Sequence, residues 1–236
     1  MKMGKMKPER IARFAIDLLF PPRCVFCGAV VPPGSQICRE CAAQIRPSGE
    51  VRCEPLPLRD RKVLCAFLYP YGGKVRDSVL DFKFHGRKEN AAFYARQLAA
   101  RVRLAFPGAG FDFVTSVPLS AERKKERGYD QSELVAAKLA RELGVPYRAS
   151  LKKVRGNRVQ HLLGRLERAE NVKGVYRLVG QDAADGKRIL LVDDIVTTGY
   201  TLAECASVLL CGGAADVSCA AVAKAFPEQV ENSRSL

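Results

Sequence analysis

The feature that most constrains the fold of this chain is a run of four apolar residues, 189–192, that ends in two adjacent carboxylates, Asp193 and Asp194. A short continuous apolar run indicates a strand of a parallel sheet, because helices cover both faces of such a sheet. Ionised side chains are costly to bury without partners, so we expect the carboxylates at the exposed end of this strand. Ligands bind at that end in open α/β sheets. The stretch therefore predicts both an α/β fold and the place of its ligand site.

Strand-like and helix-like segments alternate over most of the chain. Ser132 is expected to cap one of the helices at its N-terminus, and Gly144 to end it. The predicted strands are 63–69, 111–118, 189–194 and 216–225, and the predicted helices are 73–86, 90–106, 132–144 and 201–213. The alternation predicts a parallel sheet with helices on both faces.

Two cysteine pairs stand near the N-terminus, Cys24 with Cys27 and, after ten further residues, Cys38 with Cys41. Each Cys-x-x-Cys pair places two thiolates on one ion through a tight turn, and two such pairs complete a tetrahedral zinc site. A thioredoxin-like redox pair is the alternative, but that motif needs a single pair between a strand and a long helix. Four protein ligands leave no open position, so we predict a structural Zn2+ that folds a segment too small to build its own core.

These features divide the chain into five parts. We expect a basic N-terminal segment, a four-cysteine finger, a linker rich in proline and charge, the α/β domain and a C-terminal tail. Their predicted bounds are 1–20, 21–50, 51–61, 62–226 and 227–236.

The charge balance points to an anionic partner. The formal net charge is +14 and the isoelectric point is about 9.6, which suits a nucleic acid, a phosphorylated metabolite or an acidic membrane surface. No apolar stretch approaches the roughly 18 residues of a membrane span, and the basic N-terminus lacks a small-residue cleavage site. We therefore expect a cytoplasmic protein without a membrane span. The segment 11–20 is expected to dock either on the protein itself or peripherally at the inner face of the membrane.

A small polar turn follows the two carboxylates. Thr197, Thr198 and Gly199 form this turn, and Tyr200 and Thr201 open the next helix. Backbone N–H groups, hydroxyls and the helix dipole converge there and favour a phosphate. The carboxylates would repel that phosphate unless they face ribose hydroxyls or Mg2+ on the same ligand. A phosphate, a ribose diol and a metal together describe 5-phosphoribosyl pyrophosphate (PRPP), whereas a plain turn leaves the paired aspartates unexplained.

The segment ILLVDDIVTTGYT resembles the ribose-phosphate signature of the type I phosphoribosyltransferases. Further segments extend the resemblance, and their order is that of the ComF (ComFC-like) competence proteins over nearly all of residues 18–224. They read LLFPPRCVFCG, YPYGGKVRDSVLDFKFHG, SVPLSAERKKERGYDQSELVAAKLA, RVQHLLGRLERAENVKGVY and VDDIVTTGYT. The resemblance implies an α/β, type I phosphoribosyltransferase-like parallel sheet with helices on both faces, preceded by a small zinc-ribbon-like finger.

The resemblance also implies roles for individual residues. Asp193 and Asp194 are expected to contact the ribose hydroxyls and to stabilise charge that develops at the ribose. The 5′-phosphate is expected at Thr197, Thr198, Gly199, Tyr200 and Thr201. The pyrophosphate-side loop corresponds to Arg123, Arg127, Gly128 and Gln131, and the flexible loop over the reacting centre to Arg155, Gln160, Arg168 and Asn171. The family usually has asparagine where this chain has Asp130, so we expect a weaker anion site beside it.

Two functions remain open on the sequence. The resemblance implies a protein that handles incoming single-stranded DNA in natural transformation, with PRPP and Mg2+ at the donor site and DNA-uptake proteins as partners. The alternative is an active phosphoribosyltransferase that transfers ribose-5-phosphate from PRPP to a nitrogenous acceptor, for which Phe226 is a stacking candidate. The basic segment 152–174 suits either a loop that closes over pyrophosphate or a track for single-stranded DNA, with Tyr176 or His161 for stacking.

Overall fold

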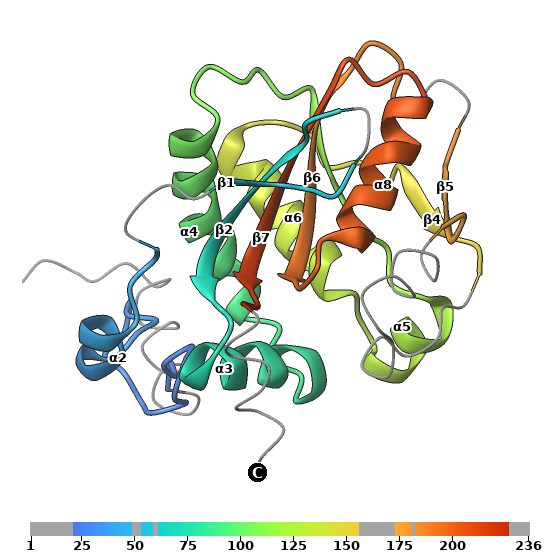
Figure 1. Ribbon diagram of the computed structural model, residues 1–236. Helices are drawn as coiled ribbons and strands as arrows, with labels where there is room; N and C mark the ends of the chain where they lie inside the picture. The colour runs from blue at the N-terminus through green and yellow to red at the C-terminus, as the bar shows by residue number, and fades with distance from the viewer. Residues whose placement is uncertain (1–20, 49–52, 59–60, 156–172, 181–182, 227–236) are drawn as a thin grey trace, which may run out of the picture. The chain divides into compact units, whose positions relative to one another are not determined.

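The computed structural model in Figure 1 describes residues 21–48, 53–58, 61–155, 173–180 and 183–226. Contacts within the chain divide it into two units, residues 1–46 and 47–236. The predicted N-terminal segment 1–20 and the predicted tail 227–236 lie outside the described residues. None of the helices in the described ranges combines the length and the apolar character that a membrane crossing requires.

The first unit holds both cysteine pairs. Its helix α2 spans Arg39–Gln44, and an isolated antiparallel bridge joins Arg23 to Val30 on the two sides of the first pair. Cys24 and Cys41 are fully buried. A unit this small buries little apolar surface, so it depends on a cross-link such as a bound metal for its stability.

A five-stranded sheet forms the centre of the second unit, in the order β1-β2-β7-β6-β3 (Figure 1). Strands β2, β7, β6 and β3 run parallel, and β1 pairs antiparallel with β2 at one edge. The strands span Cys53–Pro55 (β1), Leu64–Pro70 (β2), Phe113–Ser116 (β3), Arg188–Val196 (β6) and Asp216–Lys224 (β7). The predicted parallel sheet and its four predicted strands are confirmed.

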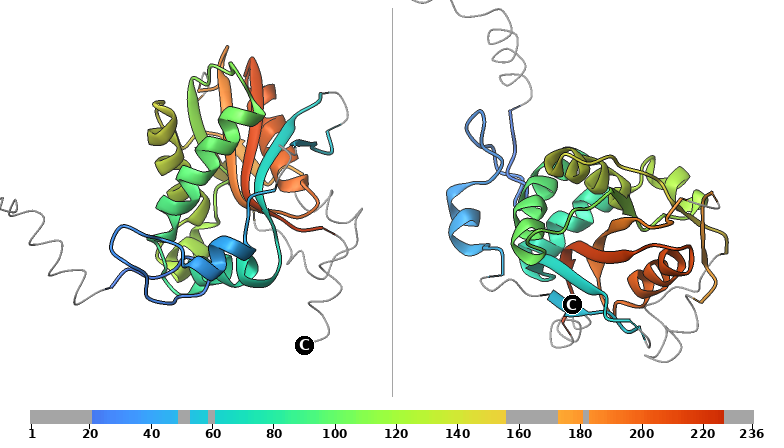
Figure 2. Two further views of the ribbon diagram at one scale, coloured as in Figure 1. Left: turned by 90° about the vertical axis from the view of Figure 1, so that its left-hand side faces the viewer. Right: turned by 90° about the horizontal axis from the view of Figure 1, so that it is seen from above.

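Helices cover both faces of this sheet. Helix α8 packs on one face, and α4 and α6 pack together on the opposite face, as the view from above in Figure 2 also shows. The helices of this unit span Gly73–Phe84 (α3), Asn90–Ala105 (α4), Ala121–Arg127 (α5), Gln131–Leu143 (α6) and Tyr200–Cys211 (α8). The predicted α/β architecture is therefore confirmed.

Strand β6 explains why the apolar run is continuous. Its alternate residues Ile189 and Leu191 pack in one cluster with Leu202 and Leu209 of α8. The intervening side chains point to the other face of the sheet, because successive residues of a strand alternate, and they are also fully buried. Apart from Arg188 at its start, the polar residues of this strand are Asp193 and Asp194 near its carboxyl end.

The segment 51–61, predicted to be a linker, contains strand β1, which corrects that prediction. Cys53 lies opposite Ala66 of β2, and Glu54 forms an ion pair with Lys224 of β7. A strand of three residues is too short to show an alternating pattern, so the sequence does not predict it. It forms because it pairs with the edge of β2.

Two further elements lie where loops were expected. Helix α5 occupies the segment assigned to the pyrophosphate-side loop. Strands β4, Leu151–Lys153, and β5, Tyr176–Leu178, pair antiparallel in a separate two-stranded sheet. This pair forms the base of the segment 152–174, whose residues 156–172 lie outside the described ranges.

The cap of helix α6 is Asp130 rather than the predicted Ser132. Asp130 Oδ1 accepts a hydrogen bond from the N–H of Glu133 at 3.1 Å, and its Oδ2 accepts one from the N–H of Leu119 at 2.8 Å. An asparagine has only one acceptor oxygen, so it would satisfy one of these two donors. The aspartate that departs from the family pattern therefore has a backbone role, while Gly144 ends the helix as predicted.

Candidate functional site

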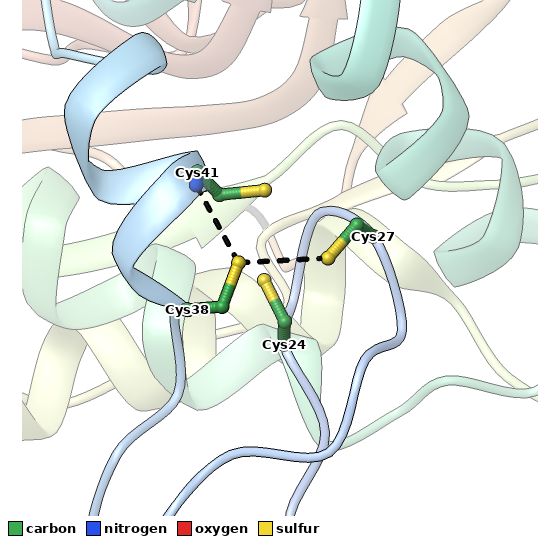
Figure 3. A group of neighbouring side chains, drawn as sticks. All are labelled: Cys24, Cys27, Cys38 and Cys41. Atoms are coloured by element: carbon green, nitrogen blue, oxygen red, sulfur yellow. Dashed lines mark hydrogen bonds between the residues drawn. The ribbon is translucent and has the colours of Figure 1, made fainter.

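The four cysteines of the finger form a compact group of sulfur atoms, drawn in Figure 3. Their Sγ atoms all lie within 4.8 Å of one another, and the Sγ atoms of Cys27 and Cys38 are 3.7 Å apart. A tetrahedral zinc ion bound at about 2.3 Å to each sulfur requires a separation of about 3.8 Å. The residues present therefore fit a structural Zn2+ held by Cys24, Cys27, Cys38 and Cys41.

Local backbone hydrogen bonds shape both halves of this group. In the first pair, the N–H of Gly28 donates to the carbonyl of Cys24 at 2.9 Å, and Gly28 has a φ of 71° that favours glycine. In the second pair, the Sγ of Cys38 accepts a hydrogen bond from the N–H of Cys41 at 3.4 Å and so caps helix α2. Each Cys-x-x-Cys pair is thus a self-contained turn.

A second site lies where β6 passes into α8. The turn Thr197–Gly199 leads directly into the helix, and Gly199 is its N-cap with a φ of 80°. A Cβ at this position would lie 3.2 Å from side-chain atoms of both Leu56 and Pro57, so the turn needs glycine for its conformation and for its space. The first backbone N–H groups of a helix have no acceptors within it, and here they face the carboxyl end of the sheet.

The two carboxylates of this site have different partners. Asp193 Oδ1 accepts hydrogen bonds from Ser132 Oγ at 2.9 Å and from the N–H of Asp194 at 2.8 Å. Asp194 Oδ2 forms an ion pair with Lys83 Nζ at 2.9 Å, and both of these side chains are largely buried. Helix α6 thereby contacts Asp193, and helix α3 contacts Asp194.

Burial, and then the charge of Asp194, raise the pKa of Asp193 to about 7. In the unfolded chain the group has its ordinary pKa of about 3.9. Between these two values the folded state retains a proton that the unfolded state releases, so Asp193 reduces stability progressively as the pH rises from 4 to 7. Near neutral pH this carboxyl is poised between its protonated and ionised forms.

Replacing Asp193 with asparagine is therefore expected to stabilise the protein at alkaline pH. The amide oxygen can still accept both hydrogen bonds that Oδ1 accepts. The difference in melting temperature between variant and wild type should grow from pH 4 to pH 7 and stay constant above it. Thermal unfolding across this range measures that difference, and a difference that does not change with pH would contradict the raised pKa.

A cavity of about 360 Å³ opens at this edge of the sheet. Of the predicted site residues, it brings together Asp193, Asp194, Thr197, Gly199, Thr201, Arg123, Arg127 and Gln131. Thr198, Tyr200, Gly128 and Arg155 do not line it. Gln160, Arg168 and Asn171, like His161, lie outside the described residues.

Two of the residues that do not line the cavity have structural contacts instead. Gly128 is the C-cap of helix α5. Arg155 donates hydrogen bonds to the backbone carbonyls of Lys173 and Gly174, at 3.0 Å and 3.3 Å. These two hydrogen bonds join the two ends of the segment 152–174, whose residues 156–172 lie outside the described ranges.

The cavity also contains residues that sequence reasoning missed. Lys83 and Tyr71 line it from the region of α3, and Lys153 lines it from the small β4–β5 sheet. Tyr176, which the sequence suggested for stacking, lines it from the same small sheet. Burial, and then the charge of Arg123, lower the pKa of Lys153. No motif marks Lys83, because a lysine in the last turn of an amphipathic helix is an ordinary surface pattern.

Arg127 occupies the rim of the cavity. Its Nη1 donates to Oε1 of Gln131 at 2.9 Å, and its guanidinium carbon lies 4.7 Å from the centroid of the Phe84 ring. Its Nε is buried, and no hydrogen-bond partner for it lies among the described residues. An unsatisfied buried donor costs about 1–3 kcal/mol, so this arrangement is suited to an incoming anion.

The donor set fits Mg2+ with a ribosyl phosphate. Mg2+ prefers one or two carboxylates together with substrate phosphates, and the acidic pair offers that combination. The turn at Gly199 offers N–H groups to a phosphate, and Arg123 and Arg127 offer cations on the other side of the cavity. The arrangement is thus suited to one ligand that carries phosphate at two ends and hydroxyls between them.

Comparisons with known proteins match two domains of the chain. Residues 15–65 match the double zinc ribbon domain, and residues 130–235 match the phosphoribosyl transferase domain. The chain is 33% identical over 202 residues to the DNA utilization protein YhgH of Salmonella typhimurium, covering 82% of this chain and 86% of that protein. It is 30% identical over 205 residues to the competence protein ComFC of Bacillus subtilis, covering 83% and 75%. It is 29% identical over 197 residues to the competence protein F of Haemophilus influenzae, covering 80% and 78%. From this similarity along most of the chain, and from a zinc ribbon that precedes a phosphoribosyltransferase domain, the protein belongs to the ComF family of competence and DNA utilization proteins.

Proposed function

We propose that the protein binds PRPP together with Mg2+ in the cavity at the end of β6, and that it handles incoming single-stranded DNA in the cytoplasm during natural transformation. The observation that carries the first half is the convergence of Asp193, Asp194 and the Gly199 turn on one cavity. Calorimetric titration of PRPP in the presence of Mg2+ tests it directly.

The 5′-phosphate is assigned to the start of helix α8. The helix dipole and the N–H groups of the first turn favour a dianion, and Thr197 and Thr201 also line the cavity. Leu56 and Pro57 pack so close to Gly199 that a Cβ there would lie 3.2 Å from each of them, which limits the space available to this turn. A preorganised turn loses little entropy on binding, which favours affinity.

The ribose is assigned to the acidic pair. A carboxylate accepts hydrogen bonds from vicinal hydroxyls, and charge-assisted bonds of this kind are among the stronger polar contacts. Lys83 offsets the repulsion between the two carboxylates and the phosphates, because it pairs with Asp194. Asp193 and Asp194 are the residues that would hold Mg2+, and the ion would neutralise negative charge on the pyrophosphate.

The pyrophosphate is assigned to the side of the cavity formed by α5. Arg123 and Arg127 line that side, and the buried Nε of Arg127 is a donor that the described residues leave without an acceptor. A guanidinium is suited to phosphate because it offers several donors in a planar fork.

The second half of the proposal rests on the relatives and on the charge. The printed names of the relatives refer to competence and to DNA utilization, and the net charge of +14 favours a polyanion. Helix α5 has the sequence AERKKER, and it contributes Lys124 and Lys125 next to the cavity residue Arg123. We assign DNA contact to this helix, with DNA-uptake proteins as partners.

Changing Lys124 and Lys125 to glutamate is expected to flatten the salt dependence of single-stranded DNA binding. Each phosphate contact contributes a slope of about −0.7 in log affinity against log salt, so two lost contacts reduce the slope by about 1.4. The matched control is Lys187→Glu with Arg188→Glu. It changes the net charge by the same amount, at the end of β6 that lies away from the cavity. An unchanged slope for the α5 variant would remove this helix from the DNA contact surface.

A second candidate function is transfer of the ribosyl group, and the raised pKa of Asp193 favours it. A nitrogen of the acceptor would attack C1′ of the ribose, the bond to pyrophosphate would break, and the leaving pyrophosphate would take the electron pair. A carboxyl with a pKa of about 7 is suited to take the proton that the acceptor loses. Ionised carboxylates at the ribose would also stabilise the positive charge that develops there. Release of pyrophosphate from PRPP only in the presence of an acceptor would identify this activity.

A further inference from the structure

Phe84 stands exposed at the rim of the cavity, at the end of helix α3. Its side chain lines the cavity and is 58% exposed. Among the exposed large apolar side chains in the described part of the chain, Phe84 is the aromatic one; the others are Val30, Leu104, Val154 and Val179. A phenyl ring held in solvent beside a polar cavity costs hydrophobic free energy, which a ligand that covers it would recover.

The other aromatic candidates are occupied by packing. Phe226, which the sequence suggested for stacking, packs edge-on against Phe67 with the ring centroids 5.8 Å apart. Tyr176, suggested for stacking on single-stranded DNA, is 5% exposed. Phe226 and Tyr176 are thus packed against the protein itself, and their stacking roles stay predictions.

The ring of Phe84 is supported on one face, and the backbone before it is anchored. Arg127 lies over it, with the guanidinium carbon 4.7 Å from the ring centroid. The backbone around it is fixed to the segment that enters α6, because Tyr129 donates to the carbonyl of Phe82 and Gln131 donates to the carbonyl of Lys83 at 3.4 Å. A ring with a fixed backbone and one supported face is a preorganised platform, and little freedom is lost when a second flat group stacks on it.

The chemistry around the ring selects its ligand. A flat group that stacks on an aromatic ring beside arginine and lysine side chains is a nucleobase joined to phosphates, and this combination is how proteins hold single strands without reading their sequence. Arg123, Lys125 and Arg127 supply the cations. An apolar peptide would leave these cations unpaired.

We propose that Phe84, backed by Arg127, is a stacking platform for one nucleobase of a single-stranded DNA at the entrance of the PRPP cavity. This inference rests on the proposed function and adds a location for the strand. The base would lie on the ring while the neighbouring phosphates follow helix α5. The strand would then cross the mouth of the donor cavity, so DNA and PRPP would meet at one edge of the sheet.

The test uses the full chain and an oligothymidylate that carries one 2-aminopurine, whose fluorescence falls when the base stacks. Wild type is expected to quench the fluorescence. Phe84→Leu keeps an apolar side chain at an exposed position but loses the ring, so its affinity should fall about tenfold and the quenching should disappear. Phe84→Trp should restore both. Leu104→Ala is the control, because this residue is 68% exposed and lies on α4 away from the cavity.

The salt dependence separates stacking from phosphate contact. Phe84→Leu should lower affinity at every salt concentration without changing the slope, since the ring contacts no phosphate. If wild type binds the oligonucleotide and Phe84→Leu binds it with the same affinity, the platform is overturned and the proposed DNA function remains. Unquenched fluorescence on wild type, or no recovery with tryptophan, would also overturn it. No binding of the oligonucleotide by wild type would overturn the platform and the proposed DNA function together.

Discussion

Replacing Asp193 and Asp194 together with asparagine is expected to weaken the binding of PRPP in the presence of Mg2+ by at least about 100-fold. Hydrogen bonds to charged groups contribute about 1.5–3 kcal/mol each, and the double variant loses two such contacts to the ribose. It also loses the carboxylates that would hold Mg2+. Calorimetric titration of PRPP with Mg2+ into both proteins measures the change.

The control for this experiment is a variant with the same change in net charge. Asp77→Asn with Asp81→Asn removes two exposed carboxylates from helix α3, outside the cavity. Its affinity for PRPP should equal that of wild type, because the charge it changes is solvated. Asp194→Asn leaves Lys83 without its carboxylate partner, and Asp193→Asn offsets part of that cost because the ionised Asp193 opposes folding at neutral pH. Thermal unfolding of the double variant checks that it stays folded. Equal affinity of wild type and the cavity variant would exclude the acidic pair from the ligand site.

Removing the zinc ligands is expected to unfold the finger while the α/β unit remains folded. Cys24→Ser with Cys41→Ser takes away the two fully buried ligands. Binding of structural zinc contributes about 10–16 kcal/mol in zinc-finger peptides, which exceeds what a unit of this size gains from its core. The variant should therefore contain no zinc and expose residues 21–46 to proteases.

The second unit has its own core, so its thermal transition should persist in this variant. Cys211→Ser is the matched control, because Cys211 is exposed and lies outside the sulfur group. Elemental analysis should find one zinc per chain in wild type and in this control, and none in the double variant. A finger that resists proteolysis after loss of its metal would show that the cysteines do not carry its stability.

The parts of the protein that sequence reasoning predicted correctly are those whose residues lie close together in the chain. The two cysteine pairs are local turns, and their spacing already implies how each pair meets an ion. The strand, the acidic pair and the Thr-Thr-Gly turn are also consecutive, and the burial of 189–192 follows from their apolar character alone. Local spacing is sufficient where the geometry is set by a single turn or strand.

The parts that needed the tertiary structure depend on which elements become neighbours. Lys83 reaches Asp194 only because α3 ends at the edge of the sheet where β6 also ends. Strand β1 has too few residues for a pattern of its own, and it exists because β2 offers an unpaired edge. In the sequence, Phe84 is one residue of a predicted amphipathic helix. Its position beside Arg127 at the cavity is seen only in the tertiary structure.

Asp130 and Ser132 show most clearly the difference between what local preference predicts and what long-range packing decides. Both are good caps for the same helix, and local preference does not choose between them. The N–H of Leu119, eleven residues from Asp130, donates to its carboxylate and selects Asp130 as the cap. Ser132 is thereby free to donate to Asp193, 61 residues away. The sequence by itself determined which chemical groups the protein has and how each short stretch turns; long-range packing decided which groups meet, because sheet order and helix placement depend on burial of the whole core.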